Sequence, residues 1–230
     1  MPITRQPQHK AAVFDLDGTL LNTLPSMVAA CRETTDILDL PPFGEEAVRT
    51  FVGMGQRVLV DRMMAASGVE DKALIDRAQA IYKEIFPRLS TYKVEAFEGI
   101  EESLECLSAM GFKLAVMTNK LDRLTPGVLA RVFPPHRFDD IRGSLPGVPL
   151  KPDPASTLEQ LARLGADPAT SFFIGDSDID ILTGRAAGMR TMAVSWGFQP
   201  LQKLEALSPD YLVHKPADIT GLIRQSLERA

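Results

Sequence analysis

Short apolar segments alternate with helical patterns along most of this chain, and this alternation is the feature that most restricts its fold. The candidate strands are short and bounded by Gly, Pro or Asp, as buried parallel strands tend to be, at residues 11–15, 112–118, 137–141, 171–176, 190–195 and 210–213. Helical patterns lie between them, at residues 99–111, 122–133, 153–165 and 178–188. Strands that alternate with helices predict a doubly wound α/β structure around a mostly parallel sheet.

Residues 24–92 interrupt this alternation. They contain no strand pattern, and apolar residues recur at helical spacing, at Leu74, Ala78, Ile81 and Ile85. The stretch "FVGMGQ" places Gly53 and Gly55 in this helical region, which favours a loop there. We therefore expect two domains: an α/β core from residues 1–23 and 93–230, and an inserted all-helical cap domain from residues 24–92.

Composition excludes several classes of protein. A chain of 230 residues that is 45% hydrophobic can form one sizeable core with a smaller appended domain. The net charge of -5 argues against a nucleic-acid-binding surface, and the two cysteines have neither disulfide nor metal-ligand spacing. The polar N-terminal segment is followed by an apolar run far too short for a signal peptide or a membrane span. We expect a cytoplasmic protein that binds neither nucleic acid nor membrane.

Two groups of carboxylates follow predicted strands. In "VFDLDGTLLNT" Asp15 and Asp17 are two residues apart, so on a strand they share one face and repel each other. A solvated pair in a loop explains this motif equally well when it is taken alone. However, "GDSDID" (175–180) ends another strand, and the carboxyl ends of parallel strands are where ligands bind in such sheets. Several carboxylates at one edge suit a hard cation such as Mg²⁺, which would offset their repulsion.

Three further polar residues are placed at the same edge by the pattern. Thr118 and Asn119 end the second predicted strand, and Lys151 lies in the Pro-rich stretch "PLKPDP" before a helix. A hydroxyl, an amide and an ammonium can all bind phosphate oxygens. Each residue alone is usually explained by capping or solvation, but their order and placement together favour a phosphate site.

The segments "DLDGT" (15–19), "TN" (118–119), "KP" (151–152) and "GDSDID" (175–180) resemble the four motifs of the haloacid dehalogenase-like phosphatases, in the same order. The resemblance covers essentially the whole chain, including the helical insert after the first motif. It implies a Rossmann-like core with a cap, and an Mg²⁺-dependent hydrolysis of phosphate esters.

The resemblance also implies roles for individual residues. Asp15 would be the nucleophile that forms an aspartyl phosphate, and Asp17 the general acid and then the general base. Thr118 and Lys151 would hold the phosphoryl oxygens. Substrate would also contact other residues of the first two motifs, namely Gly18, Thr19 and Asn119.

The same resemblance implies a set of metal ligands. Mg²⁺ would be bound by the Asp15 carboxylate, the Asp17 main-chain carbonyl and Asp176. Asp180 would lie beyond these ligands or reach the metal through water, and Asp178 is a weaker candidate because the family motif varies at that position.

Substrate choice is expected to lie in the cap. Residues 48–60, "VRTFVGMGQRVLV", are similar to the cap of the phosphoglycolate phosphatases, as are "VEAFEGI" and "PDYLVHKPADI" elsewhere. This implies 2-phosphoglycolate or a similar small phosphate ester as substrate. Arg49 and Arg57 are candidates to face its carboxylate, or are solvated helix residues; Gly53 and Gly55 let the backbone approach the substrate, or are an ordinary helix break.

Other functions stay open from the sequence. A sugar phosphomutase or an inorganic pyrophosphatase could use the same scaffold. A receiver-type signalling domain also combines acidic residues, Thr and Lys, but there the Lys comes last and the chain is shorter. A non-catalytic binding module would not need the complete set of acidic and basic residues. We expect a monomer or a homodimer whose partner is a small-molecule phosphate ester.

Overall fold

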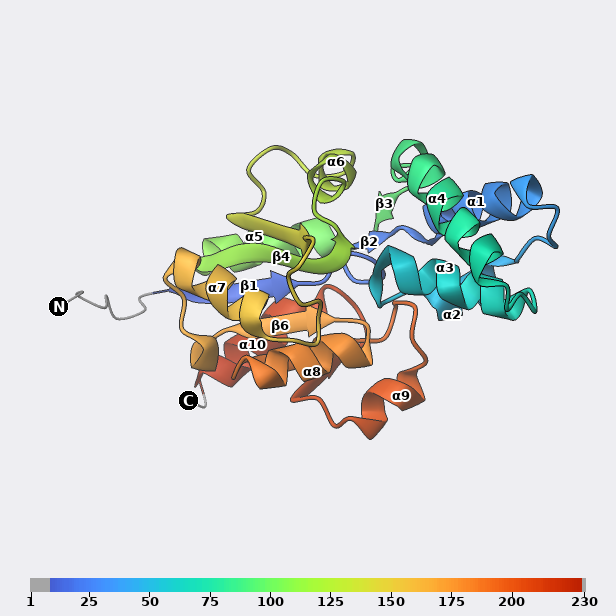
Figure 1. The fold of residues 1–230 in the computed structure, drawn as a ribbon. Helices are drawn as coiled ribbons and strands as arrows, with labels where there is room; N and C mark the ends of the chain where they lie inside the picture. Colours follow the sequence, from blue (N-terminus) through green and yellow to red (C-terminus); the bar gives the residue numbers. More distant parts are fainter. Residues whose placement is uncertain (1–8, 229–230) are drawn as a thin grey trace.

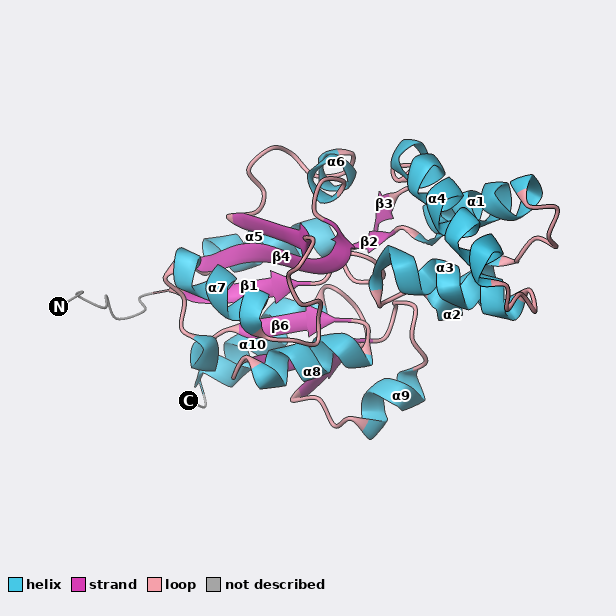
Figure 2. Cartoon of the chain, in the orientation of Figure 1, coloured by secondary structure: helices cyan, strands magenta, loops and turns pink. Residues whose placement is uncertain are grey.

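The computed structural model describes residues 9–228 of the chain. Within this range one sheet contains six parallel strands in the order β5-β4-β1-β6-β7-β8. The bounds are β1 Lys10–Phe14, β4 Phe112–Leu121, β5 Asp140–Ser144, β6 Phe172–Gly175, β7 Arg190–Val194 and β8 Tyr211–Val213. Helices cover both faces of the sheet, and a second group of helices lies beyond the ends of its strands (Figures 1 and 2). The predicted doubly wound α/β fold is confirmed.

Strand β1 is at the centre of the sheet, between β4 and β6. From β1 the chain proceeds outward through β4 to β5, and then returns to the other side of β1 to form β6, β7 and β8. The connections on the two sides of β1 therefore run in opposite directions. A crevice for ligands forms at such a reversal, at the carboxyl ends of the strands.

The alternation of side chains along the strands divides the core into two layers. Ala12 and Phe14 of β1 belong to one buried hydrophobic cluster, whereas Ala11 and Val13 belong to another. The first cluster lies under α5 (Ile100–Ala109), α6 (Thr125–Ala130) and α10 (Asp218–Glu228). The second includes residues of α7 (Ala155–Leu164), and α8 (Asp178–Ala186) packs on β6 and β7. Strands buried on both faces explain the almost continuous apolar runs in the sequence.

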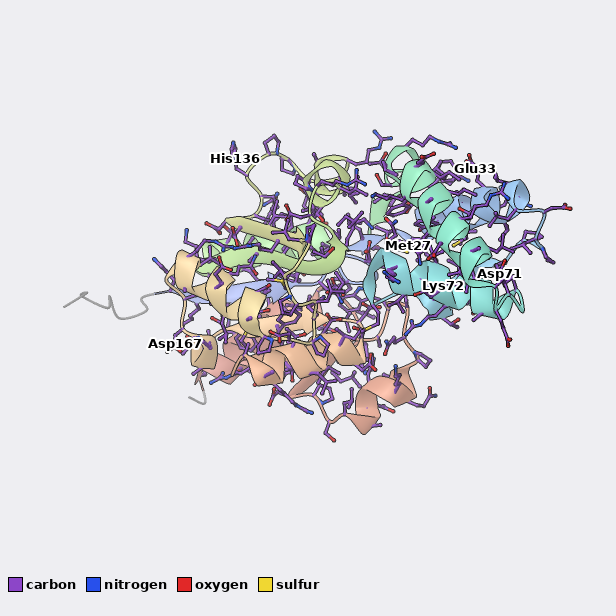
Figure 3. The ribbon with its side chains drawn as sticks, in the orientation of Figure 1. Met27, Glu33, Asp71, Lys72, His136 and Asp167 are labelled. Atoms are coloured by element: carbon purple, nitrogen blue, oxygen red, sulfur yellow. The ribbon has the colours of Figure 1, made fainter. Side chains whose placement is uncertain are left out.

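Residues 24–92, here called the cap segment, form four helices: α1 Leu24–Ile37, α2 Glu45–Phe51, α3 Gly55–Ala66 and α4 Lys72–Leu89. These helices enclose a separate hydrophobic cluster that includes Met63, Met64 and Tyr82. In Figure 3 Glu33 and Asp71 lie in the cap segment, while His136 and Asp167 lie at the far side of the core. The predicted all-helical insert is confirmed, and it lies beyond the carboxyl end of β1 (Figure 1), whereas the exact domain limits stay a prediction.

Both connections between the core and the cap segment pass through one small ribbon. Strand β2 (Leu21–Asn22) pairs antiparallel with β3 (Glu95–Ala96), and the pattern of the sequence gave no sign of either strand. These strands lie at residues 21–22 and 95–96, close to the predicted limits of the cap domain at residues 24 and 92. The ribbon therefore holds the entry and the exit of the cap segment side by side.

The structure corrects several element boundaries. The predicted strand at 137–141 begins only at Asp140 and continues to Ser144, because Gly143 leaves room for a close approach to the backbone of Asp122. Strand β4 continues past Thr118 to Leu121, where it pairs again with Ser144. Helices α9 (Leu201–Ala206) and α10 and the short 3-10 helix η1 (Pro168–Thr170) had not been predicted. Among residues 9–228, none of the helices combines the length and the apolar composition needed to cross a bilayer.

Candidate active site

Lys151 lies at the centre of the acidic cluster. It belongs to the loop between β5 and α7, and its side chain is buried. Its ammonium donates a hydrogen bond to Asp180 Oδ1 at 2.7 Å and lies 2.9 Å from Asp15 Oδ1. Asp15 directly follows β1, and Asp180 lies in the first turn of α8. One buried cation therefore joins carboxylates from two different strand ends.

Asp180 is held by the start of its own helix. Ser177 is the N-cap of α8, and its backbone N–H and hydroxyl donate to Asp180 Oδ2 at 3.0 and 2.6 Å. This is a capping box, in which the residue three positions into the helix returns to the cap. Because Lys151 takes the other oxygen, both oxygens of Asp180 already have donors within the protein. Asp180 thus orients Lys151.

Asp176, at the end of β6, is fixed by close packing. Its Oδ1 accepts from the Thr19 hydroxyl at 3.2 Å, and its Oδ2 accepts from the Phe198 backbone N–H at 2.6 Å. A Cβ at Gly197 would lie 2.2 Å from Asp176 Cβ, and one at Gly18 would lie 2.4 Å from Asp176 Oδ2. Gly18 also has a φ of +86°, which favours glycine. Gly18 and Thr19 therefore pack against the carboxylate of Asp176.

Burial and crowding disturb the ionisation of this cluster. Burial raises the pKa of Asp15 to about 7, an effect that Lys151 opposes and that Asp180 and Asp17 reinforce. Burial and the charges of Asp180 and Asp15 hold the pKa of Asp176 well above its usual range. Burial lowers the pKa of Lys151, but Asp15 and Asp180 outweigh it and the net direction is upward. One ammonium is insufficient for these carboxylates, and a further cation would favour their ionised forms.

The acidic cluster fits a hard divalent cation. Asp15, Asp176 and Asp180 each offer a carboxylate oxygen, and these oxygens lie within 4.8 Å of one another. Oxygen ligands of this kind are those that Mg²⁺ prefers. Asp178, in contrast, lies 2.8 Å from Lys203 and accepts from Gln199, so it is occupied outside the cluster.

Asp17 forms a second buried ion pair, with Lys120. The Lys120 ammonium lies 2.8 Å from Asp17 Oδ1 and 3.2 Å from Oδ2, and the Thr23 hydroxyl donates to Oδ1 at 2.6 Å. The Lys120 side chain is only 2% exposed, and its ammonium lies 5.1 Å from the centre of the Phe86 ring on α4. This lysine was missed by the sequence analysis because the strand was predicted to end at Thr118.

Asn119 connects three segments of the site. Its side-chain amide donates to the carbonyl oxygens of Gly53 and Lys151 at 3.0 and 3.2 Å, and its Oδ1 accepts from the Lys151 backbone N–H at 2.9 Å. Neighbouring Thr118 accepts a hydrogen bond from the Lys120 backbone N–H at 3.2 Å and lines the pocket. Asn119 therefore ties the cap segment and the Lys151 loop to the end of β4.

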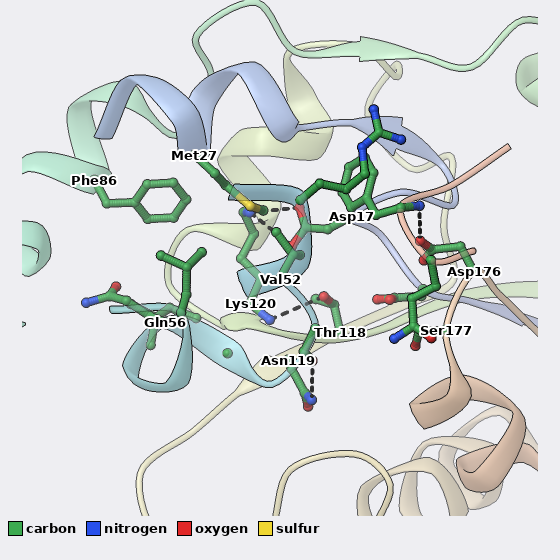
Figure 4. Close-up of a pocket in the computed structure, with 18 of the residues that line it drawn as sticks. Asp17, Met27, Val52, Gln56, Phe86, Thr118, Asn119, Lys120, Asp176 and Ser177 are labelled. Atoms are coloured by element: carbon green, nitrogen blue, oxygen red, sulfur yellow. Dashed lines mark hydrogen bonds and ion pairs between the residues drawn. The ribbon is translucent and has the colours of Figure 1, made fainter. Parts of the chain in front are cut away.

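A pocket lies between these polar groups and the cap segment (Figure 4). The core contributes the acidic groups of the pocket, Asp15, Asp17 and Asp176. The cap segment contributes a largely apolar wall, which includes Met27, Val52, Leu59, Tyr82 and Phe86. In Figure 4 Lys120 and Asp17 meet close to Met27, with Asp176 and Ser177 on the opposite side. The pocket thus combines a charged core side with an apolar cap side.

The two candidate arginines of the cap segment are separated by the structure. Arg49 lines the pocket, and its Nε is buried without a hydrogen-bond partner among the described residues. Its guanidinium makes one long contact, 3.3 Å from Glu45. Arg57 has a side chain that is 84% exposed and lies 4.0 Å from Asp61 on the outer face of α3. Only Arg49 is placed to meet a ligand in the pocket.

The two glycines of "FVGMGQ" bring the cap segment close to the core. They have positive φ values, +119° at Gly53 and +81° at Gly55, and both line the pocket. A Cβ at Gly55 would lie 3.2 Å from the carbonyl oxygen of Asn119. The predicted loop is therefore present between α2 and α3, and its backbone approaches the end of β4. Contact of these glycines with substrate stays a prediction.

Comparison with known proteins agrees with this fold and places the chain in a family. Residues 12–194 match the sequence model of the family described as haloacid dehalogenase-like hydrolase. The phosphoglycolate phosphatase of Psychrobacter arcticus is 35% identical over 86% of this chain and 88% of its own length. Phosphoglycolate phosphatase 1 of Pseudomonas aeruginosa is 31% identical over 98% and 83%. A crystal structure of a predicted phosphoglycolate phosphatase from Haemophilus somnus superposes with a TM-score of 0.85, at 28% identity over 94% and 98%.

The structure has a doubly wound sheet with carboxylates and a buried lysine at its switch point, facing a helical insert, and the family model matches most of this chain. The chain belongs to the haloacid dehalogenase-like hydrolases. Within that family it is a phosphatase, and the relatives that it resembles are phosphoglycolate phosphatases.

We expect Gly197→Ala to disturb Asp176. The added Cβ has no space unless Asp176 moves, and residues that orient a metal ligand typically contribute roughly 10- to 100-fold to metal affinity. Titration calorimetry with Mg²⁺ should show a loss of affinity in this range. Gly221→Ala, on the exposed side of α10 with no atom within 4 Å of the new Cβ, is the matched control. Unchanged Mg²⁺ affinity in the Gly197 variant would show that Asp176 is not a ligand.

The raised pKa of Asp15 predicts a pH-dependent effect of metal on stability. In the unfolded chain the pKa of this group is about 3.8, so the folded protein binds the proton of Asp15 more tightly. The binding of this proton therefore contributes fully to stability below the unfolded pKa. The contribution is lost as the pH rises through about 7. Mg²⁺ should therefore raise the unfolding temperature more at pH 8 than at pH 5.5. Thermal unfolding with Mg²⁺ and with a chelator measures this, and Asp15→Asn should reduce the difference; equal shifts at both pH values would contradict it.

Proposed function

We propose that this phosphatase hydrolyses 2-phosphoglycolate or a similar small phosphate monoester with Mg²⁺, through an aspartyl phosphate on Asp15. The observation that carries the proposal is the Asp15 carboxylate, which lines the pocket while Lys151 holds its Oδ1 at 2.9 Å. The proposal is supported by the relatives, whose names include this substrate.

Asp15 is suited to act as the nucleophile. Its hydrogen bonds within the described residues reach Oδ1, from the Leu16 backbone N–H at 2.7 Å and from Lys151. Oδ2 is the oxygen left to attack phosphorus. In the proposed first step a bond forms between this oxygen and phosphorus, and the bond from phosphorus to the leaving oxygen breaks. Thr118 and Lys151 stabilise the charge on the phosphoryl oxygens, as preorganised donors do in phosphoryl transfer.

Asp17 is suited to move the protons. It lines the same pocket two residues after Asp15, and its partner Lys120 lies near Phe86 of the cap segment. In its protonated form it would give its proton to the leaving alkoxide, and the alcohol departs. As a carboxylate it would then take a proton from the water that attacks the aspartyl phosphate, which releases inorganic phosphate and restores Asp15.

The proposed cation would be held by Asp15, the Asp17 main-chain carbonyl and Asp176, with Asp180 supporting the site through Lys151. When bound, Mg²⁺ supplies positive charge that neutralises the phosphate and positions it for attack. The fixed donors to Asp176, from Thr19 and Phe198, keep its carboxylate directed in the absence of a ligand.

The close approach of the cap segment to the core supports a small substrate. The apolar wall from α1, α3 and α4 lines the same pocket as the acids, and the glycine loop approaches the end of β4. Arg49 is proposed to face the substrate, because its Nε is buried and has no partner among residues 9–228. A sugar phosphomutase or an inorganic pyrophosphatase on the same scaffold is an outcome that the substrate test distinguishes.

We expect Asp17→Asn to reduce turnover by roughly 10²- to 10⁴-fold, because an amide can neither give nor take the proton. The variant should remain folded, since Asn keeps the shape of Asp and has an amide oxygen that can still accept from Lys120 and Thr23. Steady-state kinetics and circular dichroism test the two parts. Near-normal turnover in a folded variant would remove Asp17 from the proposed mechanism.

The substrate is tested by phosphate release from a panel of esters. It should include 2-phosphoglycolate, sugar phosphates, nucleotides and pyrophosphate, each with Mg²⁺ and with a chelator. We expect metal-dependent turnover with the highest kcat/KM for 2-phosphoglycolate, and none with Asp15→Asn. Preference for another ester would keep the mechanism and replace the substrate; preference for pyrophosphate, or phosphate transfer within a sugar, would favour the alternatives.

A further inference from the structure

We propose that Lys120 determines substrate specificity by binding an anionic group on the leaving alcohol, which in 2-phosphoglycolate is the carboxylate. This inference rests on the proposed function and deepens it. Lys120 is not among the site residues predicted from the sequence. The proposed interaction is an ion pair between its ammonium and the substrate carboxylate.

Lys120 is placed in the pocket by the continuation of β4. The strand extends to Leu121, with an irregular register after Met117, and the Lys120 backbone N–H binds back to the Thr118 hydroxyl. The side chain runs to the cap side of the pocket, where its ammonium lies near the Phe86 ring (Figure 4). Lys120 thus belongs to the core, but its ammonium lies against the apolar wall that the cap segment forms.

The distances place Lys120 beside the leaving group. Asp17, as the proposed acid, must come within hydrogen-bond distance of the leaving oxygen, and the Lys120 ammonium lies 2.8 Å from Asp17. In 2-phosphoglycolate one carbon separates that oxygen from the carboxylate, and each bond spans about 1.5 Å. A carboxylate on so short a chain stays within the surroundings of Asp17. The ammonium that already contacts Asp17 is therefore within its reach.

The charges of the pocket favour this assignment. An ammonium has three donors, and within the described residues the hydrogen bonds of Lys120 all go to the single carboxylate of Asp17. The arrangement differs from that of Lys151, which two carboxylates hold. A cation that is 2% exposed gains from a second anionic partner, because few water molecules reach it. Apart from Lys120, the cationic group among the pocket-lining residues is Arg49.

The decisive test compares two substrates that differ by the carboxylate: 2-phosphoglycolate and ethyl phosphate. Lys120→Met removes the ammonium and keeps an apolar stem. It should lower the ratio of kcat/KM for 2-phosphoglycolate to that for ethyl phosphate by roughly 10- to 100-fold, the usual effect of a hydrogen bond to a charged group. Any disturbance of Asp17 affects both substrates and cancels in the ratio. Lys113→Met is the matched control, because Lys113 lies on the same strand but pairs with Asp139 at the surface.

A second measurement guards against misfolding of the single variant, in which Asp17 would lose its buried partner. Calorimetry compares the binding of both esters to Asp17→Asn and to Asp17→Asn/Lys120→Met, which removes both charges of the pair. We expect the second substitution to weaken binding of 2-phosphoglycolate by a similar factor and to leave ethyl phosphate unchanged.

The outcomes separate this inference from the proposed function. Equal losses for both substrates would overturn the role of Lys120 and leave the proposed function intact. A wild-type enzyme that does not prefer 2-phosphoglycolate to ethyl phosphate would overturn the proposed substrate, and the role of Lys120 with it. A preserved ratio in Lys113→Met and a reduced one in Lys120→Met would support both.

Discussion

The buried contact of Lys151 with Asp15 and Asp180 is the interaction on which the rest of the site depends. Carboxylates from the ends of β1 and β6 cannot crowd together in a poorly solvated crevice unless a cation compensates them. Lys151 provides part of that compensation, and Ser177 in turn holds Asp180 in place. The parallel strands bring these carboxylates together, and the Lys151 ammonium offsets part of the repulsion between them.

The second buried pair, Lys120 with Asp17, has a different balance. Lys151 is shared by acids on two elements, so each of its partners restrains the other. Lys120 has one acid and the face of Phe86. The two lysines therefore have different roles, because their partners differ. One stabilises the fixed group of acids in the core, and the other stands at the boundary with the cap segment, where a ligand meets the protein.

The parts of the site that sequence could predict are those fixed by strand ends. Asp15, Thr118 and Asp176 follow apolar runs, and parallel packing necessarily places such ends at one edge. Lys120 was not predictable in this way, because β4 continues through an irregular register that no local pattern shows. The contacts of Gly197 and Phe198 with Asp176 also escaped prediction. They come from a loop after β7 whose path is set by tertiary packing. Tertiary packing also sets the ribbon of β2 and β3 and the short helix α9.

Phe198 joins the core to the cap segment. Its backbone N–H donates to Asp176, while its ring belongs to the hydrophobic cluster of the cap segment. The core and the cap segment have distinct clusters, so each can tolerate changes of side chain without repacking the other. This phenylalanine is an exception, because one residue serves both, and Leu124 of the core also packs against the cap cluster. The shape of the cap segment is therefore limited at this point by the chemistry of the core, because a shift of the Phe198 ring would also shift the backbone N–H that holds Asp176.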